Sequence, residues 1–521
     1  MRFLLFFLVL MTLGQLPSCT QPASAGEQEQ VYSQQVSRRE HLQQPRQAPL
    51  AGGYAAYQAL FEKYDRYKEP AIRQRRFKNA DIVPLLQKLG APFKVFEAGR
   101  SIENRPIYRV QAGQGPVKVL LWSQMHGDES TATMALLDIF RFLSADDEFN
   151  DLRRRLLGEL TIVALPMLNP DGAERYTRRN ALGIDLNRDA LRLQCPESQL
   201  LKQTRDELDA HWGFNLHDQN RYYAAGKNPK TATMSFLAPA YNEAKDVNEV
   251  RGNAMRLIGW MNGLVQSYLP GQIGRYDDEF EPRAFGDNIQ KWGTSTILIE
   301  CGGMPKDPEK QYIRKVHFVL LLAALDAIAR QEYRGTEPAA YEQIPFNESG
   351  SFHDLILREV EIDFKGESYL VDVAFQRREV DVDKNRDYYY RAEISELGDL
   401  SVFFAYDEFD GRGYRAVPGK IYSRVLGNAG EIKNLDPLDL LRQGYTGIRL
   451  RDLPARDKMD HFPFKLLAPD KSDDTRVSIG SNASLLLKKG DRIEAVVVNG
   501  FLFDLKKDAD LIRRLVDRIG N

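Results

Sequence analysis

The amino-acid sequence predicts an α/β domain with a mostly parallel mixed sheet flanked by helices, followed by a β-rich C-terminal domain. In the first domain, short apolar runs typical of buried strands alternate with amphipathic segments of helical periodicity, and this alternation is typical of a largely parallel sheet. After about residue 337 the sequence changes to short β-branched and aromatic runs broken by Gly, Asp and Asn, which indicates β-structure. The predicted boundaries are 54–336 for the first domain and 337–521 for the second.

The individual elements follow from the spacing of apolar residues. Helical patterns cover residues 54–67 and 81–89. The apolar runs that predict strands are 117–122, 160–165, 213–216 and 296–299. Apolar side chains recur at helical spacing in the helix expected to open at Glu129, namely at Ala132, Leu136, Ile139, Phe140 and Leu143, so this helix should pack on the sheet. In the second domain, Lys489-Gly490-Asp491 and Asn499-Gly500 predict hairpin turns.

The first 18 residues indicate an export signal. Arg2 precedes an apolar run over residues 3–13, and Leu16-Pro17-Ser18 then leads directly to Cys19. This pattern resembles a bacterial lipoprotein signal, which implies that Cys19 becomes the lipidated first residue of the mature protein. The alternative is an ordinary secretory signal with an incidental cysteine. Residues 19–53 are rich in Gln, Ser, Pro and charge, which predicts a flexible tether. We therefore expect a location in the bacterial cell envelope, on the periplasmic or outer-membrane face, with membrane attachment through the lipid anchor only.

Composition excludes some classes of function. The 521 residues are 43% apolar, and 71 Lys and Arg nearly balance 73 Asp and Glu, for a formal net charge of −2. No overall field favours nucleic acid, so no nucleic-acid partner is expected. Once Cys19 is set aside, only Cys195 and Cys301 remain, which excludes a disulfide scaffold. The sequence leaves open whether these two pair.

Two histidines and a carboxylate follow predicted strands. His126-Gly127-Asp128-Glu129 comes directly after the first strand, and His217 ends another strand 88 residues beyond Glu129. Two His and one carboxylate suit a catalytic zinc ion, which keeps its fourth position for water. Asp218 or a nearby carbonyl could orient the free ring nitrogen of His217. The competing interpretations are an acidic helix start for the tetrapeptide and a buried, hydrogen-bonded histidine for His217.

Further polar groups complete a hydrolase-like set. Glu300 follows the last strand, where open α/β sheets carry their sites, and is a candidate general base; the alternative is a surface-loop Glu. Between the ligands lie the turn Asn169-Pro170-Asp171-Gly172 and an arginine-rich stretch over residues 178–188. A guanidinium group there could stabilise an oxyanion and another could bind a substrate carboxylate, whereas the alternative is a solvated basic loop.

Taken in order, these motifs resemble the carboxypeptidase A family of zinc peptidases. The motifs are His-x-x-Glu, Asn-Pro-Asp-Gly, an Arg followed by Asp-Leu-Asn-Arg, Leu-His-Asp and a strand-end Glu, and the stretch 99–107 upstream also resembles the family. The resemblance covers residues 93–303. It implies that His126, Glu129 and His217 bind one zinc ion, that Glu300 is the general base and later the proton donor, and that Arg178 stabilises the oxyanion. It further implies that Asn187 and Arg188 hold the terminal carboxylate of a peptide substrate.

The resemblance implies a metallocarboxypeptidase acting on peptides with a free C-terminal carboxylate. An enzyme tethered in the envelope would meet periplasmic, surface and cell-wall peptides. Two alternatives remain. Zinc deacylases of the aspartoacylase and succinylglutamate desuccinylase type resemble the same motifs, and a non-catalytic peptide-binding protein could use the same scaffold. The sequence leaves open whether Tyr276 supplies the family's phenolic group, which side chain the segment 283–288 selects, and what the C-terminal domain does.

Overall fold

The computed structural model describes residues 54–454 and 461–519, which fall within one compact unit. The predicted signal peptide, Cys19 and the tether lie outside the described residues. Among the described residues, no helix combines the length and the hydropathy needed to cross a membrane.

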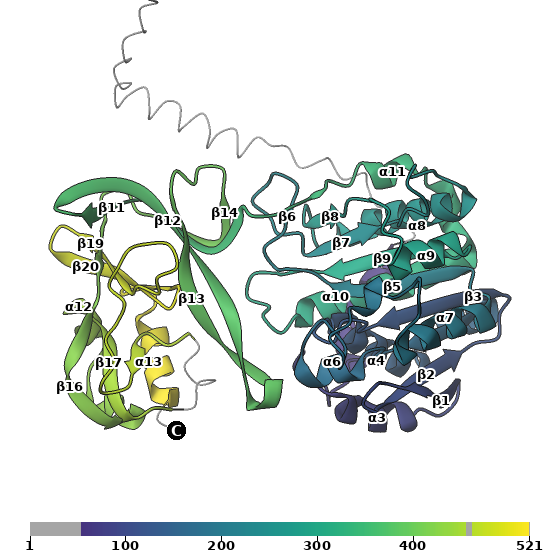
Figure 1. The fold of residues 1–521 in the computed structure, drawn as a ribbon, viewed down its shortest axis with the longest axis horizontal. Helices are drawn as coiled ribbons and strands as arrows, with labels where there is room; N and C mark the ends of the chain where they lie inside the picture. Colours follow the sequence, from purple (N-terminus) through teal and green to yellow (C-terminus); the bar gives the residue numbers. More distant parts are fainter. Residues whose placement is uncertain (1–53, 455–460, 520–521) are drawn as a thin grey trace, which may run out of the picture. The chain divides into compact units, whose positions relative to one another are not determined.

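An eight-stranded mixed sheet forms the first part of the fold (Figure 1). In spatial order its strands are β1 (Phe93–Arg100), β2 (Pro106–Ala112), β4 (Leu160–Leu165), β3 (Val117–Ser123), β5 (Trp212–Asp218), β9 (Ser295–Cys301), β7 (Met234–Leu237) and β8 (Ile273–Arg275). The contiguous strands β4, β3, β5 and β9 pair in parallel, whereas β1–β2, β2–β4 and β7–β9 are antiparallel. These four parallel strands are the four that the sequence predicts, so the prediction of a mostly parallel mixed sheet is confirmed.

Helices cover both faces of this sheet (Figure 1). Alternate residues of β3 enter different cores, because Leu121 shares a core with Leu136 and Leu320. Leu120 belongs to a separate core that contains Leu201. A strand buried on both faces reads as a continuous apolar run, which explains why the central strands were recognisable. The helices of this part are α2 (Ala55–Glu62), α3 (Asn79–Gln87), α4 (Thr131–Ser144), α5 (Asn150–Glu159), α6 (Pro170–Arg175), α7 (Pro196–Leu208), α8 (Glu249–Val265), α9 (Phe285–Lys291) and α10 (Gln311–Arg330).

The predicted helix after Glu129 is present as α4, which begins two residues later, at Thr131. Its apolar face is buried, as the helical spacing predicts. The short 3-10 helices near the first sheet are η1 (Tyr64–Arg66), η2 (Leu186–Arg188) and η3 (Glu332–Gly335).

The chain stays with the first part beyond residue 337. Helix α11 (Ala339–Glu342) places Tyr341 in the same core as α8, and β10 (Asn347–Glu348) pairs with β6 (Ala224–Ala225). The second large sheet begins only with β11 at Phe352.

The C-terminal part is β-rich, as predicted. Its larger sheet runs in the order β13 (Asp387–Gly398), β12 (Glu367–Val382), β11 (Phe352–Phe364), β15 (Arg415–Pro418), β19 (Leu485–Lys489), β20 (Arg492–Val498) and β21 (Phe501–Asp504), with β14 (Phe404–Asp410) paired to β11. A smaller parallel sheet contains β16 (Lys420–Asn428), β17 (Tyr445–Asp452) and β18 (Lys465–Leu467), and the helical segments are η4 (Asp383–Asn385), η5 (Ala429–Asn434), α12 (Pro437–Arg442) and α13 (Ala509–Ile519).

Both predicted hairpin turns are present, between β19 and β20 and between β20 and β21. Asn499 and Gly500 have φ values of 49° and 71°. Positive φ at both central residues is the conformation that two-residue hairpin loops favour.

Candidate metal centre

The His126–Glu129 turn is shaped by its glycine. A Cβ atom on Gly127 would stand 1.9 Å from the carbonyl carbon of Gly172 in α6, so only glycine allows the two backbones to approach this closely. The amide of Glu129 donates to the carbonyl of His126 at 3.2 Å. The turn curls back before α4 begins, and the side chains of His126 and Glu129 converge.

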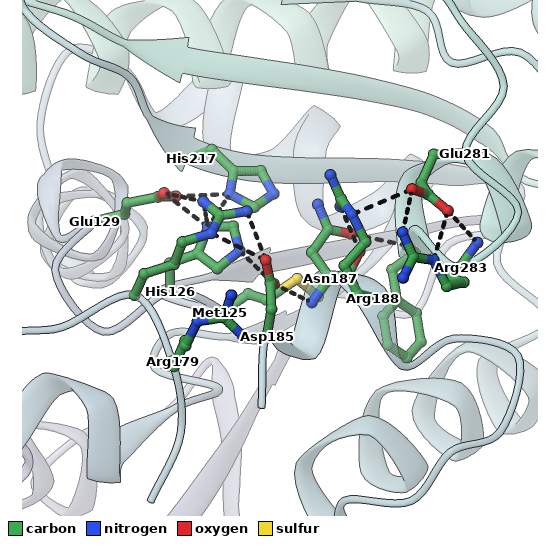
Figure 2. Close-up of polar contacts among 12 residues, drawn as sticks. Met125, His126, Glu129, Arg179, Asp185, Asn187, Arg188, His217, Glu281 and Arg283 are labelled. Carbon is green, nitrogen blue, oxygen red and sulfur yellow. Dashed lines mark hydrogen bonds and ion pairs between the residues drawn. The ribbon is translucent and has the colours of Figure 1, made fainter. Parts of the chain in front are cut away.

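Three side chains meet at the carboxyl ends of the central strands (Figure 2). Nδ1 of His126 and Nδ1 of His217 each lie 2.7 Å from one carboxylate oxygen of Glu129, and the two Nδ1 atoms are 3.2 Å apart. Both histidines are buried. Burial alone would raise the pKa of Glu129, but the two imidazole groups hold it below its usual range.

The donor set fits a metal ion. The candidate ligand atoms of His126, Glu129 and His217 all lie within 4.8 Å of one another, and all three residues are buried. Both ring nitrogens of His126 face carboxylates, Glu129 at Nδ1 and Asp185 at Nε2. A neutral imidazole can donate to only one of them, whereas a cation shared by Nδ1 and Glu129 satisfies both groups. Two His and one Glu are the ligands of catalytic zinc sites that keep a position for water. These residues form a site for a single zinc ion.

Asp185 orients one of the ligands. Its Oδ1 lies 3.1 Å from Nε2 of His126, and its Oδ2 accepts a hydrogen bond from Nε of Arg178 at 3.0 Å. A carboxylate on the far ring nitrogen fixes the tautomer that leaves the other nitrogen free for metal. Asp185 is the first residue of the Asp-Leu-Asn-Arg motif. The motif is visible in the sequence, but the contact of Asp185 with His126 is apparent only in the structure.

The expectation for Asp218 was wrong. Its Oδ2 accepts a hydrogen bond from the Thr131 hydroxyl at 2.7 Å and lies 3.2 Å from the Lys310 ammonium. Its side chain therefore fixes the start of α4, and Nε2 of His217 has no hydrogen-bond partner among the described residues. The backbone amide of Asp218 instead donates to Oε2 of Glu129 at 3.2 Å.

Glu300 stands beside the metal ligands. It is the register partner of His217 between β9 and β5, and its Oε2 is buried without a partner among the described residues. Burial, followed by the charges of Glu129 and Asp218, raises the pKa of Glu300 well above its usual value. A carboxyl group that holds a proton this readily is suited to general acid and base chemistry.

Tyr276 lies in the same electrostatic environment. Burial raises its pKa, and the charges of Glu300 and Glu129 act in the same direction. Its ring centroid lies 5.9 Å from that of Tyr223. The sequence alone does not assign a role to Tyr276. The fold brings it close enough for the charges of both carboxylates to affect its pKa.

Arg178 contacts the metal ligands directly. Its Nη1 lies 3.1 Å from Nδ1 of His126 and 3.4 Å from Oε1 of Glu129. Arg179, by contrast, donates to the carbonyl of Gly183 at 3.0 Å. Of the two neighbouring arginines, only Arg178 reaches the centre.

Asn187 and Arg188 lie together with Glu281, apart from Glu129 (Figure 2). The side-chain oxygen of Asn187 accepts a hydrogen bond from the Phe285 amide at 2.9 Å, and Nε of Arg188 lies 3.3 Å from Glu281. Glu281 also pairs with Arg283 at 2.8 Å. The pairing of Arg188 with Glu281 was not apparent from the sequence.

The Asn-Pro-Asp-Gly segment opens a helix, where the sequence predicted a turn. Asn169 caps α6 by accepting a hydrogen bond from the Gly172 amide at 2.8 Å. Asp171 is fully buried and accepts from Ser101 and Arg105, both at 2.7 Å. The motifs at residues 99–107 and 169–172 are therefore in direct contact with each other.

The two remaining cysteines do not pair. Cys195 and Cys301 are both free and buried, and they belong to the separate cores on the two faces of the sheet.

Comparisons with known proteins agree with this centre. Carboxypeptidase 2 of Trichophyton rubrum is 24% identical over 266 residues, which covers 46% of this chain and 46% of the relative. Carboxypeptidase D of Mus musculus is 32% identical over 132 residues, covering 18% of this chain and 10% of the relative. The chain thus spans less than half the length of these curated relatives.

Among solved structures, a metallo-carboxypeptidase from Pseudomonas aeruginosa is 18% identical with a TM-score of 0.39, covering 50% of this chain and 70% of that chain. Carboxypeptidase A from Helicoverpa armigera is 16% identical with a TM-score of 0.38, covering 52% and 80%. Residues 85–255 match the family model described as zinc carboxypeptidase. The matched part of the chain contains His126, Glu129 and His217 and is similar to the zinc carboxypeptidase family.

Proposed function

We propose that this protein is a zinc-dependent carboxypeptidase that removes the C-terminal residue of peptides. The observation that carries the proposal is the convergence of two imidazole groups and one carboxylate beside Glu300, whose pKa is raised. The names of the relatives, carboxypeptidase 2 and carboxypeptidase D, support the same activity.

The proposed mechanism assigns each step to a residue of this chain. Zinc at this site would supply Lewis-acid chemistry by acidifying a water molecule and polarising the scissile carbonyl. Glu300 accepts the proton of the attacking water and returns it to the leaving amine. Arg178, which already reaches His126 and Glu129, donates to the oxyanion as charge develops.

Asn187 and Arg188 determine the direction in which the peptide substrate binds. A guanidinium group binds a carboxylate through parallel hydrogen bonds, and these two residues lie on one side of the metal ligands. In this proposal the terminal carboxylate of the peptide competes with Glu281 for the guanidinium group of Arg188. A substrate without that carboxylate would bind weakly.

The location is a separate proposal. We infer from the sequence that Cys19 is lipidated and anchors the protein in the bacterial cell envelope, where it would meet periplasmic, surface and cell-wall peptides. Metabolic labelling with an alkyne fatty acid should tag the wild-type chain and leave Cys19→Ala untagged. Equal labelling of both would contradict the anchor.

The activity is tested by mass spectrometry of a library that contains peptides and N-acyl amino acids. The chain without residues 1–19 should shorten peptides stepwise from the carboxyl end, and a chelator should stop the reaction. Glu300→Gln should lower kcat by about 10²–10⁴-fold while zinc content stays the same.

The other possible results of this library experiment each indicate a different function. Release of acyl groups with peptides left whole would replace this proposal with the deacylase. Binding of peptides with no product, by a chain that holds one zinc, would indicate the non-catalytic protein. Amidated peptides are the control, since a carboxypeptidase should leave them intact.

A further inference from the structure

A large cavity adjoins the metal centre and is lined by both parts of the fold. Its volume is about 1030 Å³, at the upper end of the range of about 300–1,000 Å³ for pockets that enclose small ligands. Asp128 and Glu129 line it from the first part, and Tyr388, Tyr390, Tyr406 and Phe501 line it from the C-terminal part. We call it the tyrosine-lined cavity.

One set of contacts holds the β12–β13 hairpin against the first part. Arg76 forms ion pairs of 2.8 Å with Glu379 and with Asp381, and Arg75 also pairs with Glu379. The Arg76 guanidinium lies 4.7 Å from the ring centroid of Tyr388. Both arginine side chains are buried and Glu379 is largely so, which shields their two pairs with Glu379 from solvent, whereas the side chain of Asp381 is 46% exposed.

This set of contacts reaches the metal motif. The carbonyl of Arg75 accepts a hydrogen bond from the hydroxyl of Ser130 at 2.5 Å, and Ser130 directly follows the ligand Glu129. The hairpin is thus connected to the ligand Glu129 through two residues, Arg75 and Ser130.

A second set of contacts lies along the segment that follows Glu300. The Tyr406 hydroxyl donates to the carbonyl of Arg221 at 2.6 Å, and a Cβ atom on Gly303 would stand 2.2 Å from that hydroxyl oxygen. Arg221 also pairs with Asp354 of β11. The C-terminal part therefore touches the chain only three residues after Glu300.

Several charged groups of the cavity wall are paired with one another. Glu379 pairs with Arg75, Asp354 pairs with both Arg221 and Arg377, and Asp218 lies 3.2 Å from Lys310. The rings of Tyr390 and Phe501 have centroids 6.1 Å apart. Beside these ion pairs, the C-terminal wall offers aromatic faces to an occupant.

The position of the cavity relative to Arg188 and the metal ligands indicates which part of a peptide would occupy it. Asn187, Arg188 and Glu281 do not line it, and Figure 2 shows Arg188 and Glu129 on opposite sides of the ligand cluster. A peptide with its terminal carboxylate at Arg188 and its scissile bond at the metal would extend past Glu129. The residues that precede the scissile bond then enter the tyrosine-lined cavity.

We propose, on the basis of the proposed carboxypeptidase function, that the C-terminal β-rich part completes the substrate site. Tyr390 and Phe501 contact the residues of the peptide that lie two and three positions before the scissile bond, and they favour apolar or aromatic side chains there. Aromatic faces supply large contact areas to such groups. The protein is therefore selective for peptides longer than two residues.

The test compares two substrates that share their last two residues. One is an acetyl dipeptide, and the other is an acetyl tetrapeptide with Phe and Leu at the added positions. For the full chain with zinc bound, Tyr390→Ala and Phe501→Ala should each lower kcat/KM for the tetrapeptide by about five- to tenfold, mainly through KM. The loss for the dipeptide should be less than twofold.

Phe364→Ala is the matched control. Phe364 lies on β11 of the same sheet, is 58% exposed and does not line the cavity, so its removal should leave both substrates unaffected. Zinc content and thermal unfolding of each variant identify any loss of folded protein.

The outcomes separate this inference from the proposed function. Equal losses on both peptides, or no loss on either, would overturn the inference while the carboxypeptidase stands. A wild-type chain that hydrolyses neither peptide would contradict the carboxypeptidase itself, and the inference would fall with it.

Discussion

Gly127 and Gly172 lie in direct backbone contact, so close that a methyl group on Gly127 would stand 1.9 Å from the carbonyl carbon of Gly172. Gly127 belongs to the turn that carries His126 and Glu129, and Gly172 to the first turn of α6. The two glycines allow α6 to support the metal turn without an intervening side chain. The spacing within His-x-x-Glu is therefore constrained by sterics as well as by ligand geometry.

Gly127→Ala should lose zinc and activity together. Overpacking typically costs about 1–3 kcal/mol, and here the new methyl group meets backbone that cannot rotate away. Zinc content and the midpoint of urea unfolding should both fall. Gly158→Ala in α5 is the control, since a Cβ there meets nothing within 4 Å and alanine favours helix by up to about 1 kcal/mol. Full zinc content in Gly127→Ala would contradict the steric argument.

Asp185→Asn should weaken zinc binding by about 10–100-fold, as loss of a ligand-orienting carboxylate typically does. The amide keeps the shape of the side chain but removes the charge that both His126 and Arg178 contact. Competition with a fluorescent chelator measures the affinity. Asp436→Asn, at the N-cap of α12, is the matched control and should bind zinc like the wild type. An unchanged affinity in Asp185→Asn would mean that Glu129 and the histidines suffice.

The features that could be predicted from the sequence are those that burial makes visible. The strands β3, β4, β5 and β9 are buried on both faces and appear as continuous apolar runs. His126, Glu129, His217 and Glu300 could be selected because each follows such a run. Strand β1 mixes exposed and half-buried positions, and β8 is only three residues long, so neither produces a clear pattern.

The remaining parts of the site depend on contacts between distant segments. Arg188 pairs with Glu281 and Arg75 with Glu379, across 93 and 304 residues of sequence. Neither pairing has a local signal, because charged residues on loops are most often solvated. The second wall of the tyrosine-lined cavity likewise becomes apparent only once the β12–β13 hairpin is placed.

Asp287→Asn should change how stability depends on pH. Burial raises the pKa of Asp287 to about 7 in the folded protein, whereas an unfolded Asp titrates near 3.9. Between about pH 4 and 7 the folded state binds more protons than the unfolded state, so this group makes the protein less stable as the pH rises. The slope is at most about 1.4 kcal/mol per pH unit.

The Asn variant keeps the hydrogen bond from the Glu281 amide to Oδ1 but has no proton to lose. Urea unfolding at pH 5 and pH 7.5 should show that the variant gains stability relative to the wild type at the higher pH. A parallel pH dependence in the two proteins would refute the assignment.

Arg314→Met should cost about 3–5 kcal/mol of unfolding free energy, as breaking a buried ion pair typically does. Arg314 of α10 and Asp138 of α4 are fully buried and pair at 2.5 Å. The same guanidinium donates to the carbonyl of Ile72 at 2.6 Å. Removing it leaves the Asp138 carboxylate uncompensated in the core and releases the segment that leads to Arg75.

The control is Arg415→Met, whose ion pair with Asp363 joins two side chains that are about half exposed. Exposed pairs contribute about 0–1 kcal/mol, so this variant should unfold within about 1 kcal/mol of the wild type. If the two variants lost the same unfolding free energy, the buried pair would contribute no more to stability than the exposed pair does. A larger loss in Arg314→Met, accompanied by weaker zinc binding, would show that α4 and α10 hold the metal turn through the segment that carries Arg75.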